Sequence, residues 1–340
     1  MENSRAAYKR IAVVVIIAAI VAIIAAVRIG RQGQGGSGLG SEYRYNISAM
    51  AYIDPAMILY EETGEAIPTG MAEARSLAVG PSGLLVVAGD QTIAAFRTDG
   101  RVQYRFSMAS APRCLTLDGE SIFIGMRDRV VITDRRGKIV ASWDSLGDKA
   151  LITGIALDDT HVYIADAGQR IVWCYDRKGR FLRRIGDRNR ERNIPGFVIP
   201  SPYFDLAMAP DGLLRVANSG RHRIEAYTAE GDLELAWGEF GNGLSAFTGC
   251  CNPVSFAVFT DGRVVTCEKG LVRIKLYDAN GELLGVVAGP EQLADGDASI
   301  CDTPAQCQKG GFDVAVDADD RVYVLDTIRN VVRIFTERKD

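Results

Sequence analysis

A short alternation of large, small and large side chains recurs six times along the chain, beginning with Leu77-Ala78-Val79. The other copies are Leu115-Thr116-Leu117, Ile155-Ala156-Leu157, Leu206-Ala207-Met208, Phe256-Ala257-Val258 and Val314-Ala315-Val316. A period of two predicts a strand, and a small middle residue suits strands that crowd around a common axis. The copies lie between 38 residues (Leu77 to Leu115) and 58 residues (Phe256 to Val314) apart. Repeats of this length predict a β-propeller, in which no single unit buries its own sheet faces.

Turn-forming residues follow these strands at fixed offsets. A first hairpin is predicted at Pro81-Ser82-Gly83, Asp118-Gly119, Pro210-Asp211-Gly212 and Asp261-Gly262. A second hairpin is predicted at Asp99-Gly100, Arg136-Gly137, Lys178-Gly179, Glu230-Gly231 and Asn280-Gly281. Glycine at such positions supplies the positive φ that tight turns need. The fold class expected is therefore all-β, with six blades of four short strands.

Within this pattern the chain resembles the NHL-repeat family of propellers. The resemblance covers about residues 75–335 and is clearest in IADAGQRIVWCY from Ile164, VANSGRHRIEAY from Val216 and VLDTIRNVVRIF from Val324. The first two repeats depart from it, because their middle hairpins are shorter and lack a matching aspartate. The resemblance implies a six-bladed NHL-like propeller that serves as a platform for binding.

The repeats are predicted near residues 75–110, 111–150, 151–202, 203–253, 254–310 and 311–340. The last repeat holds three strands, so its fourth is expected from the N-terminal segment 57–67, which would remove the free edge of the ring. A partial seventh blade built from residues 43–67 is the alternative.

A run of 17 apolar residues from Ile11 to Val27 precedes the repeats. At about 1.5 Å per residue it forms roughly 25 Å of helix, the short end of a bilayer span. We expect a cytoplasmic N-terminus (1–10), a transmembrane signal-anchor (11–29), a glycine-rich linker (30–42) and a propeller domain (43–340). Three basic residues before the span and two after it favour a single-pass protein with its propeller outside the cytoplasm, periplasmic or extracellular. Cleavage after Ala25-Ala26 is the alternative.

Three connections between repeats are long, namely Asp187 to Pro202, Glu239 to Pro253 and Pro290 to Gly310. Each joins the outer strand of one blade to the inner strand of the next, so all three are expected on one face. Insertions gathered on one face of a repeat protein usually form its working surface; growth of these loops without a ligand is the alternative. The first two contribute candidate binding residues Arg188, Arg190, Arg192, Phe240 and Phe247.

Five of the seven cysteines belong to the fifth repeat or the connections beside it, and we include them in the binding face: Cys250, Cys251, Cys267, Cys301 and Cys307. Outside the cytoplasm, disulfides are the simplest interpretation. Cys301–Cys307 is one candidate pair; Cys250 and Cys251 pair with each other or elsewhere, one of them with Cys267. A thiolate metal site or an iron–sulfur cluster is the alternative, although no C-x-x-C spacing supports it.

Repeat alignment places four oxygen-bearing residues at equivalent positions: Asp166, Asn218, Glu268 and Asp326. If they converge on the axis, they form a site for a divalent cation such as calcium, as in lactonase-like hydrolases. The competing interpretation is structural, because short polar side chains there bond the backbone N–H groups of the next hairpin.

Other chemistries find little support in the sequence. His161 and His222 are too few for a three-histidine zinc site, and no haem, phosphate-loop or nucleophile-elbow motif is present. A net charge of −4 argues against nucleic acid as a partner. We therefore expect a membrane-anchored module that binds a protein or ligand, with a protein partner in an envelope complex and no cofactor. A metal-dependent hydrolase or an accessory redox subunit remain the alternatives.

Overall fold

The computed structural model describes residues 51–294 and 311–339, all within the compact unit Ile47–Asp340. The expected anchor, the linker and the candidate residues Cys301 and Cys307 lie outside the described residues. Among the residues described, no helix has the length and apolar character needed to cross a bilayer.

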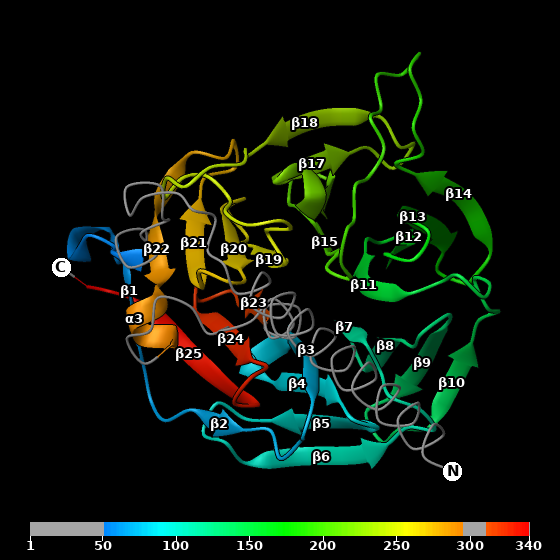
Figure 1. Cartoon of the computed structure of the whole chain (residues 1–340). Helices are drawn as coiled ribbons and strands as arrows, with labels where there is room; N and C mark the ends of the chain where they lie inside the picture. Colours follow the sequence, from blue (N-terminus) through cyan, green and yellow to red (C-terminus); the bar gives the residue numbers. More distant parts are fainter. Residues whose placement is uncertain (1–50, 295–310, 340) are drawn as a thin grey trace, which may run out of the picture. The chain divides into compact units, whose positions relative to one another are not determined.

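Six antiparallel sheets surround a common axis in the described part of the chain (Figure 1). Blade 1 contains β3 (Ala74–Val79), β4 (Leu85–Gly89), β5 (Thr92–Phe96) and β6 (Val102–Ser107). Blade 2 contains β7 (Cys114–Asp118), β8 (Ser121–Gly125), β9 (Val130–Asp134) and β10 (Ile139–Ser142). Blade 3 contains β11 (Ile152–Leu157), β12 (His161–Asp166), β13 (Ile171–Asp176) and β14 (Phe181–Ile185).

The other three blades follow in chain order around the ring. Blade 4 contains β15 (Leu206–Met208), β16 (Leu214–Asn218), β17 (Arg223–Tyr227) and β18 (Leu233–Trp237). Blade 5 contains β19 (Ser255–Val258), β20 (Val264–Glu268), β21 (Arg273–Tyr277) and β22 (Leu283–Ala288). Blade 6 contains β23 (Phe312–Val316), β24 (Val322–Asp326), β25 (Val331–Glu337) and β1 (Tyr60–Glu62), with β2 (Ile67–Pro68) also on β25. The expected all-β, six-bladed propeller is confirmed.

Blade 6 is closed by both ends of the described chain. Strand β1 pairs antiparallel with β25, with Tyr60 opposite Glu337 and Glu62 opposite Phe335. Strand β2 adds the pair Ile67–Val332 further along the same strand. The outer edge of β25 is thereby covered, so the last blade gains a fourth strand from the start of the domain.

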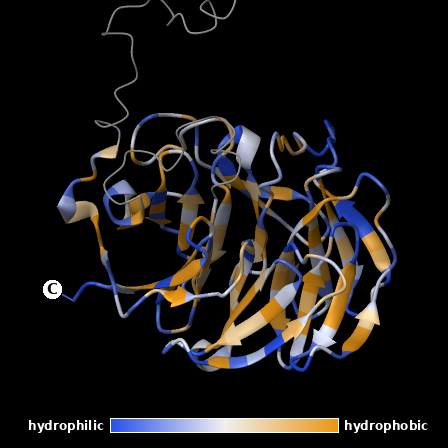
Figure 2. Ribbon diagram, turned by 60° about the horizontal axis from the view of Figure 1, so that its bottom comes forward, coloured by the Kyte–Doolittle hydropathy of each residue, from blue (hydrophilic) through white to orange (hydrophobic). Residues whose placement is uncertain are grey.

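The hydrophobic core consists of six clusters, and each lies between two neighbouring blades. Val86 and Ile93 of blade 1 pack with Ile122 and Ile124 of blade 2, for example. The same arrangement recurs at the other five blade interfaces. Figure 2 shows the consequence, with apolar strands stacked in the interior and hydrophilic turns at the ends. Because each core is shared, the blades stabilise one another rather than folding as separate units.

Glycine is required in the hairpins between the third and fourth strands. Gly179 has a φ of 82°, and a Cβ there would lie 2.5 Å from the indole of Trp143 in the preceding blade. Gly281, with a φ of 90°, meets Trp237 in the same way at 2.4 Å. In blades 3 and 5 these turns therefore pack closely on an aromatic side chain of the preceding blade, and a residue larger than glycine would not fit there.

The short helices lie between strands. They are the 3-10 turns η2 (Pro55–Met57), η3 (Pro81–Gly83) and η4 (Ser219–Arg221), and α3 (Pro290–Leu293). Of these, η3 and η4 lie in hairpins within a blade, and η2 and α3 lie outside the blades. Since strands alternate in direction, the hairpins between second and third strands share a face with the connections between blades. We call this the connection face. The hairpins between first and second strands emerge at the opposite end.

Candidate binding face and axial cavity

A cavity of about 720 Å³ lies on the propeller axis. Residues of all six innermost strands line it: β3, β7, β11, β15, β19 and β23. Its size falls in the range of small-molecule sites in proteins, about 300–1,000 Å³.

A ring of six equivalent residues surrounds this cavity, each directly before the first large residue of a repeat. They are Ser76, Cys114, Gly154, Asp205, Ser255 and Asp313. Asp313 Oδ2 accepts a hydrogen bond from Leu77 N at 2.7 Å, and Asp205 Oδ2 accepts one from Phe256 N at 3.0 Å. The hydroxyl of Ser255 donates to Asp313 Oδ1 at 2.7 Å. The two carboxyl groups thus connect the innermost strands of blades 4, 5, 6 and 1.

The two aspartates perturb one another. Burial first and the neighbouring Asp313 second raise the pKa of Asp205 to about 7. Burial likewise raises the pKa of Asp313. Two carboxyl groups that share a confined site resist simultaneous ionisation, so they titrate as a coupled pair. The pKa of the neighbouring thiols Cys114 and Cys267 is raised as well, by burial and then by these carboxylates.

Arginine side chains lie at the connection-face end of the cavity. Arg113 donates from Nε to the carbonyl of Ile152 at 3.1 Å, and Arg75 pairs with Glu73. Burial, followed by the charge of Arg75, lowers the pKa of Arg113. Lining residues at this end include Pro202, the last residue of the first long connection, and Tyr203 and Val254, which directly follow the first and the second. The mouth of the cavity therefore combines cationic groups with the ends of the connections.

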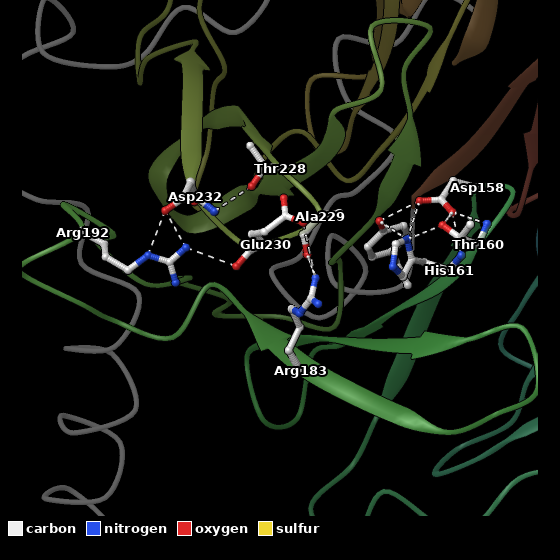
Figure 3. Close-up of polar contacts among 10 residues, drawn as sticks. Asp158, Thr160, His161, Arg183, Arg192, Thr228, Ala229, Glu230 and Asp232 are labelled. Atoms are coloured by element: carbon white, nitrogen blue, oxygen red, sulfur yellow. Dashed lines mark hydrogen bonds and ion pairs between the residues drawn. The ribbon is translucent and has the colours of Figure 1, made fainter.

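The basic stretch of the first connection divides into two parts. Arg188 and Arg190 are exposed. Arg192 instead donates from Nε to Asp232 Oδ1 at 2.8 Å and from Nη2 to the carbonyl of Glu230 at 3.2 Å (Figure 3). It fastens the connection to a turn of blade 4, and none of the three arginines lines the axial cavity.

The rest of the first connection is anchored rather than solvated. Ile194, Phe197 and Ile199 are buried in the core between blades 3 and 4. Phe197 also packs on Phe204, with ring centroids 4.9 Å apart. The backbone N–H of Val198 nearby donates to the cap residue Asn218. This segment is therefore held in a defined position against blades 3 and 4.

The two phenylalanines of the second connection have opposite placements. Phe240 is 63% exposed and meets the ring of His222 edge-on at 5.1 Å. Phe247 is fully buried and packs against Trp237 and Tyr277 in the core between blades 4 and 5. Phe247 is therefore unavailable for contact with a partner, because the connection folds back and uses it as a core residue.

The described cysteines form no disulfide with one another. Cys250 and Cys251 place their Sγ atoms 3.2 Å apart, which is a contact between thiols rather than a disulfide. Cys267 is fully buried and also free, as are Cys114 and Cys174. Among the described residues no disulfide is present, and the expected pairing of Cys250 or Cys251 with Cys267 is not observed.

The four candidate metal ligands are buried, and each accepts hydrogen bonds from backbone N–H groups. Asp166 accepts hydrogen bonds from Leu151 N and Gln169 N, and Asp326 accepts from Ile328 N. Asn218 and Glu268 accept from the backbone of the long connections, as Val198 N and Thr248 N donate to them. In residues 51–294 and 311–339 no group of three or more His, Cys, Asp or Glu side chains is arranged to hold a metal ion. These side chains cap backbone N–H groups, and those capped by Asp166, Asn218 and Glu268 belong to connections between blades.

Glu268 also belongs to a buried ionic cluster that the sequence reasoning missed. Its Oε2 lies 2.7 Å from Arg273 Nε and 3.2 Å from Lys275 Nζ, and all three side chains are at most 1% exposed. Lys275 Nζ also donates to the carbonyl of Ala246 at 2.8 Å. Burial lowers the pKa of Lys275 to about 8. The cluster therefore holds the second connection in place through its hydrogen bonds to Ala246 and Thr248.

A spacing in the sequence could have revealed this cluster. A residue seven positions after the cap contacts it in three blades: Trp173 with Asp166, Glu225 with Asn218 and Lys275 with Glu268. The signal for the axial aspartates was the shared dipeptide Phe-Asp, at Phe204-Asp205 and Phe312-Asp313.

Neither histidine lines the cavity. His161 lies in the blade 3 hairpin at the opposite end, hydrogen-bonded to Asp158 at 3.0 Å (Figure 3). His222 follows η4 and contacts the carbonyl of Gly249 at 2.8 Å. Both rings are thus engaged by neighbouring turns.

Comparison with known proteins identifies the fold. No protein-family model matches the chain, and no curated protein matches its sequence. A structure of streptogramin B lyase superposes with a TM-score of 0.56 at 11% identity, covering 84% of this chain and 100% of the other. A protein of unknown function from Bacteroides thetaiotaomicron gives 0.59 at 12% identity, with 82% and 73% covered.

A third match is a catalytically inactive histidine-to-alanine variant of virginiamycin B lyase from Staphylococcus aureus, with quinupristin. It gives a TM-score of 0.54 at 10% identity, covering 82% of this chain and 100% of the other. The chain is a six-bladed propeller similar in fold to these lyases. At such identities the likeness concerns the fold alone, and NHL membership in particular stays a prediction.

Proposed function

We propose that this chain is a membrane-anchored binding module, presented outside the cytoplasm, which holds a protein partner on its connection face. The observation that carries the proposal is the contact between the two described long connections, made by the hydrogen bond from Ser201 to Cys251, together with the exposure of Phe240 in the second of them. Val198 of the first connection is also 41% exposed. Exposed aromatic and aliphatic side chains on fixed loops are typical anchors of protein interfaces.

The caps support this proposal over the hydrolase alternative. Asn218 accepts a hydrogen bond from Val198 N at 2.9 Å, and Glu268 accepts one from Thr248 N at 2.8 Å. Both side chains are therefore already used to hold the connections. Rigid loops on a stacked scaffold suit recognition, because little conformational entropy is lost when a partner binds. No observation favours catalysis at these positions.

A photoreactive amino acid in place of Phe240 is expected to cross-link the partner in the native host. The matched control carries the same group at Val140, which is 64% exposed in β10 on the outer edge of blade 2. Equal cross-linking at both positions, or none at Phe240, would contradict the proposal. In a second experiment the photoreactive amino acid replaces Val198 instead. Adding Phe240→Ala to that protein is expected to lower the yield of cross-linked partner about 5- to 30-fold, because loss of an interface anchor costs about 1–2 kcal/mol.

The anchoring part of the proposal rests on the apolar run from Ile11 to Val27. Full-length protein is expected to stay in the membrane pellet after alkaline extraction, whereas a variant lacking residues 1–29 is expected in the supernatant. Protease added to intact cells or spheroplasts is expected to reach the propeller, because it is placed outside the cytoplasm. Release of the full-length chain by alkali would disprove the anchor.

A further inference from the structure

Two adjacent cysteines lie near the end of the second connection, close to the cavity mouth. Cys250 is exposed and Cys251 is fully buried, yet their Sγ atoms are 3.2 Å apart. Cys251 Sγ also accepts a hydrogen bond from the hydroxyl of Ser201 at 2.9 Å. Because Ser201 belongs to the first connection, the buried sulfur joins the two long connections.

The two thiols differ in acidity. Burial raises the pKa of Cys251, but hydrogen bonds from Ser201 and from the ammonium group of Lys269 outweigh it, so the net pKa is below that of an ordinary thiol. The hydrogen bond between the two thiols is the main cause of the raised pKa of Cys250. The pair therefore combines a buried thiol that ionises more readily than an ordinary one with an accessible thiol, an arrangement found at reactive cysteines.

Adjacency in the chain limits the stability of a bond between them. Neighbouring Cα atoms are about 3.8 Å apart across a trans peptide, whereas relaxed disulfides span about 4.4–6.8 Å between Cα atoms. A disulfide of adjacent residues is therefore strained. Strained and exposed disulfides are reduced more readily than structural ones, and they are the ones used in reversible chemistry.

We propose that Cys250 and Cys251 form a redox-active dithiol at the cavity mouth, which exchanges reversibly with small disulfides of the glutathione type. This site goes beyond the proposed function, since it requires neither the membrane anchor nor a bound partner. It needs only the pair of sulfurs and the groups that position them.

The exchange takes place in two steps. Cys250 first passes its proton to the Cys251 thiolate, then its sulfur attacks the small disulfide, whose bond breaks to release one thiolate. Cys251 then gives that proton to the departing thiolate and becomes a thiolate again, which Ser201 and Lys269 stabilise. This thiolate attacks the Cys250 sulfur. The second small thiolate leaves. Two protein sulfurs are oxidised and the small disulfide is reduced to one thiol and one thiolate, so electrons, protons and charge balance.

Oxidation would act on the cavity mouth through the contacts of Cys251. A sulfur bonded to Cys250 no longer carries the negative charge that Ser201 and Lys269 stabilise. Ser201 is followed by Pro202 and Tyr203, which line the cavity, and Lys269 Nζ lies 4.6 Å from the centre of the Tyr203 ring. The redox state of the pair is thus coupled to residues at the mouth.

The test uses full-length protein, equilibrated in buffers of increasing oxidised-to-reduced glutathione ratio, then acid-quenched, alkylated and mapped by peptide mass spectrometry. The peptide containing Cys250 and Cys251 is expected to lose two hydrogens in oxidising buffer and to regain them on return to reducing buffer. This measurement on the unaltered chain decides the proposal even if a variant fails to fold. A pair that stays reduced throughout, or that bonds to a third cysteine, overturns it.

Single substitutions assign the two roles. In Cys251→Ser, glutathione is expected to remain attached to Cys250, because the resolving thiol is gone. In Cys250→Ser, no glutathione is expected on buried Cys251. The control Cys174→Ser, which removes a buried thiol of blade 3, is expected to behave as the unaltered chain. Absence of the trapped mixed disulfide in folded Cys251→Ser contradicts the proposed order of attack.

Discussion

Replacing Glu268 by glutamine is expected to lower the free energy of unfolding by about 3–5 kcal/mol, the usual cost of leaving buried charges without their counter-ion. Arg273 and Lys275 lie 2.7 and 3.2 Å from the Glu268 carboxylate, and none of the three side chains is more than 1% exposed. A neutral amide would leave two cations in a site shielded from water. Since domains are typically stable by about 5–15 kcal/mol, the loss is a large fraction of the total.

Chemical denaturation followed by tryptophan fluorescence measures this change. The control is Glu120→Gln, because Glu120 pairs with Arg135 at 3.2 Å but is 80% exposed. An exposed ion pair contributes at most about 1 kcal/mol, so this variant is expected to unfold close to the unaltered chain. If both variants lost equally little, the buried cluster would not hold the second connection as described.

Raising the pH through neutrality is expected to weaken the propeller through Asp205 and Asp313. The pKa of Asp205 is about 7 in the folded protein against 3.8 ordinarily, so the folded state binds the proton more tightly than the unfolded chain does. Its contribution to stability is therefore complete below about pH 4 and is lost as the pH rises through 7. A shift of this size corresponds to at most roughly 4 kcal/mol.

The free energy of unfolding at several pH values between about 5 and 8 tests this expectation. In Asp313→Asn the like charge beside Asp205 is absent, so the fall in stability with pH is expected to become shallower, whatever the change in absolute stability. The groups facing the pair do not obscure it, because Cys114 and Cys267 have raised pKa values and stay neutral. Arg113 remains charged throughout this range.

A matched control separates this effect from general acid or base sensitivity. The carboxylate of Asp176 has a lowered pKa, because backbone N–H groups of Arg180 and Lys178 donate to it in an exposed turn. It is ionised over the whole range, so Asp176→Asn is expected to keep the pH slope of the unaltered chain. An unchanged slope in Asp313→Asn would show that the axial aspartates do not titrate as a coupled pair.

The propeller could be predicted from the sequence because its signals are local. The alternation at Leu77-Ala78-Val79 and its copies fixes the innermost strands, and glycines such as Gly179 and Gly281 fix the turns. Each signal lies within a few residues, and the alternation recurs in six repeats and the second turn in five, so errors in one repeat are corrected by the others. The number of blades follows from the count of the repeats.

The site was harder to predict, because its contacts are made across the ring. Asp205 and Asp313 are separated by 108 residues in the chain, and only closure of the propeller brings their carboxyl groups together. Phe247 was placed on the surface because an aromatic residue in a loop gives no sign that the loop folds back. Arg192 was grouped with Arg188 and Arg190, although its partner Asp232 lies in the next blade.

Pairing of β1 with β25 also has a consequence for the time at which the domain becomes complete during synthesis. The ribosome must add 277 residues after Tyr60 before Glu337, its partner, exists. At about 5–20 residues per second, the first strand waits roughly 15–55 s for the last. During that interval β1 has no partner strand in the nascent chain. A chain that terminates anywhere before β25 therefore cannot form the β1–β25 pairing that closes the ring.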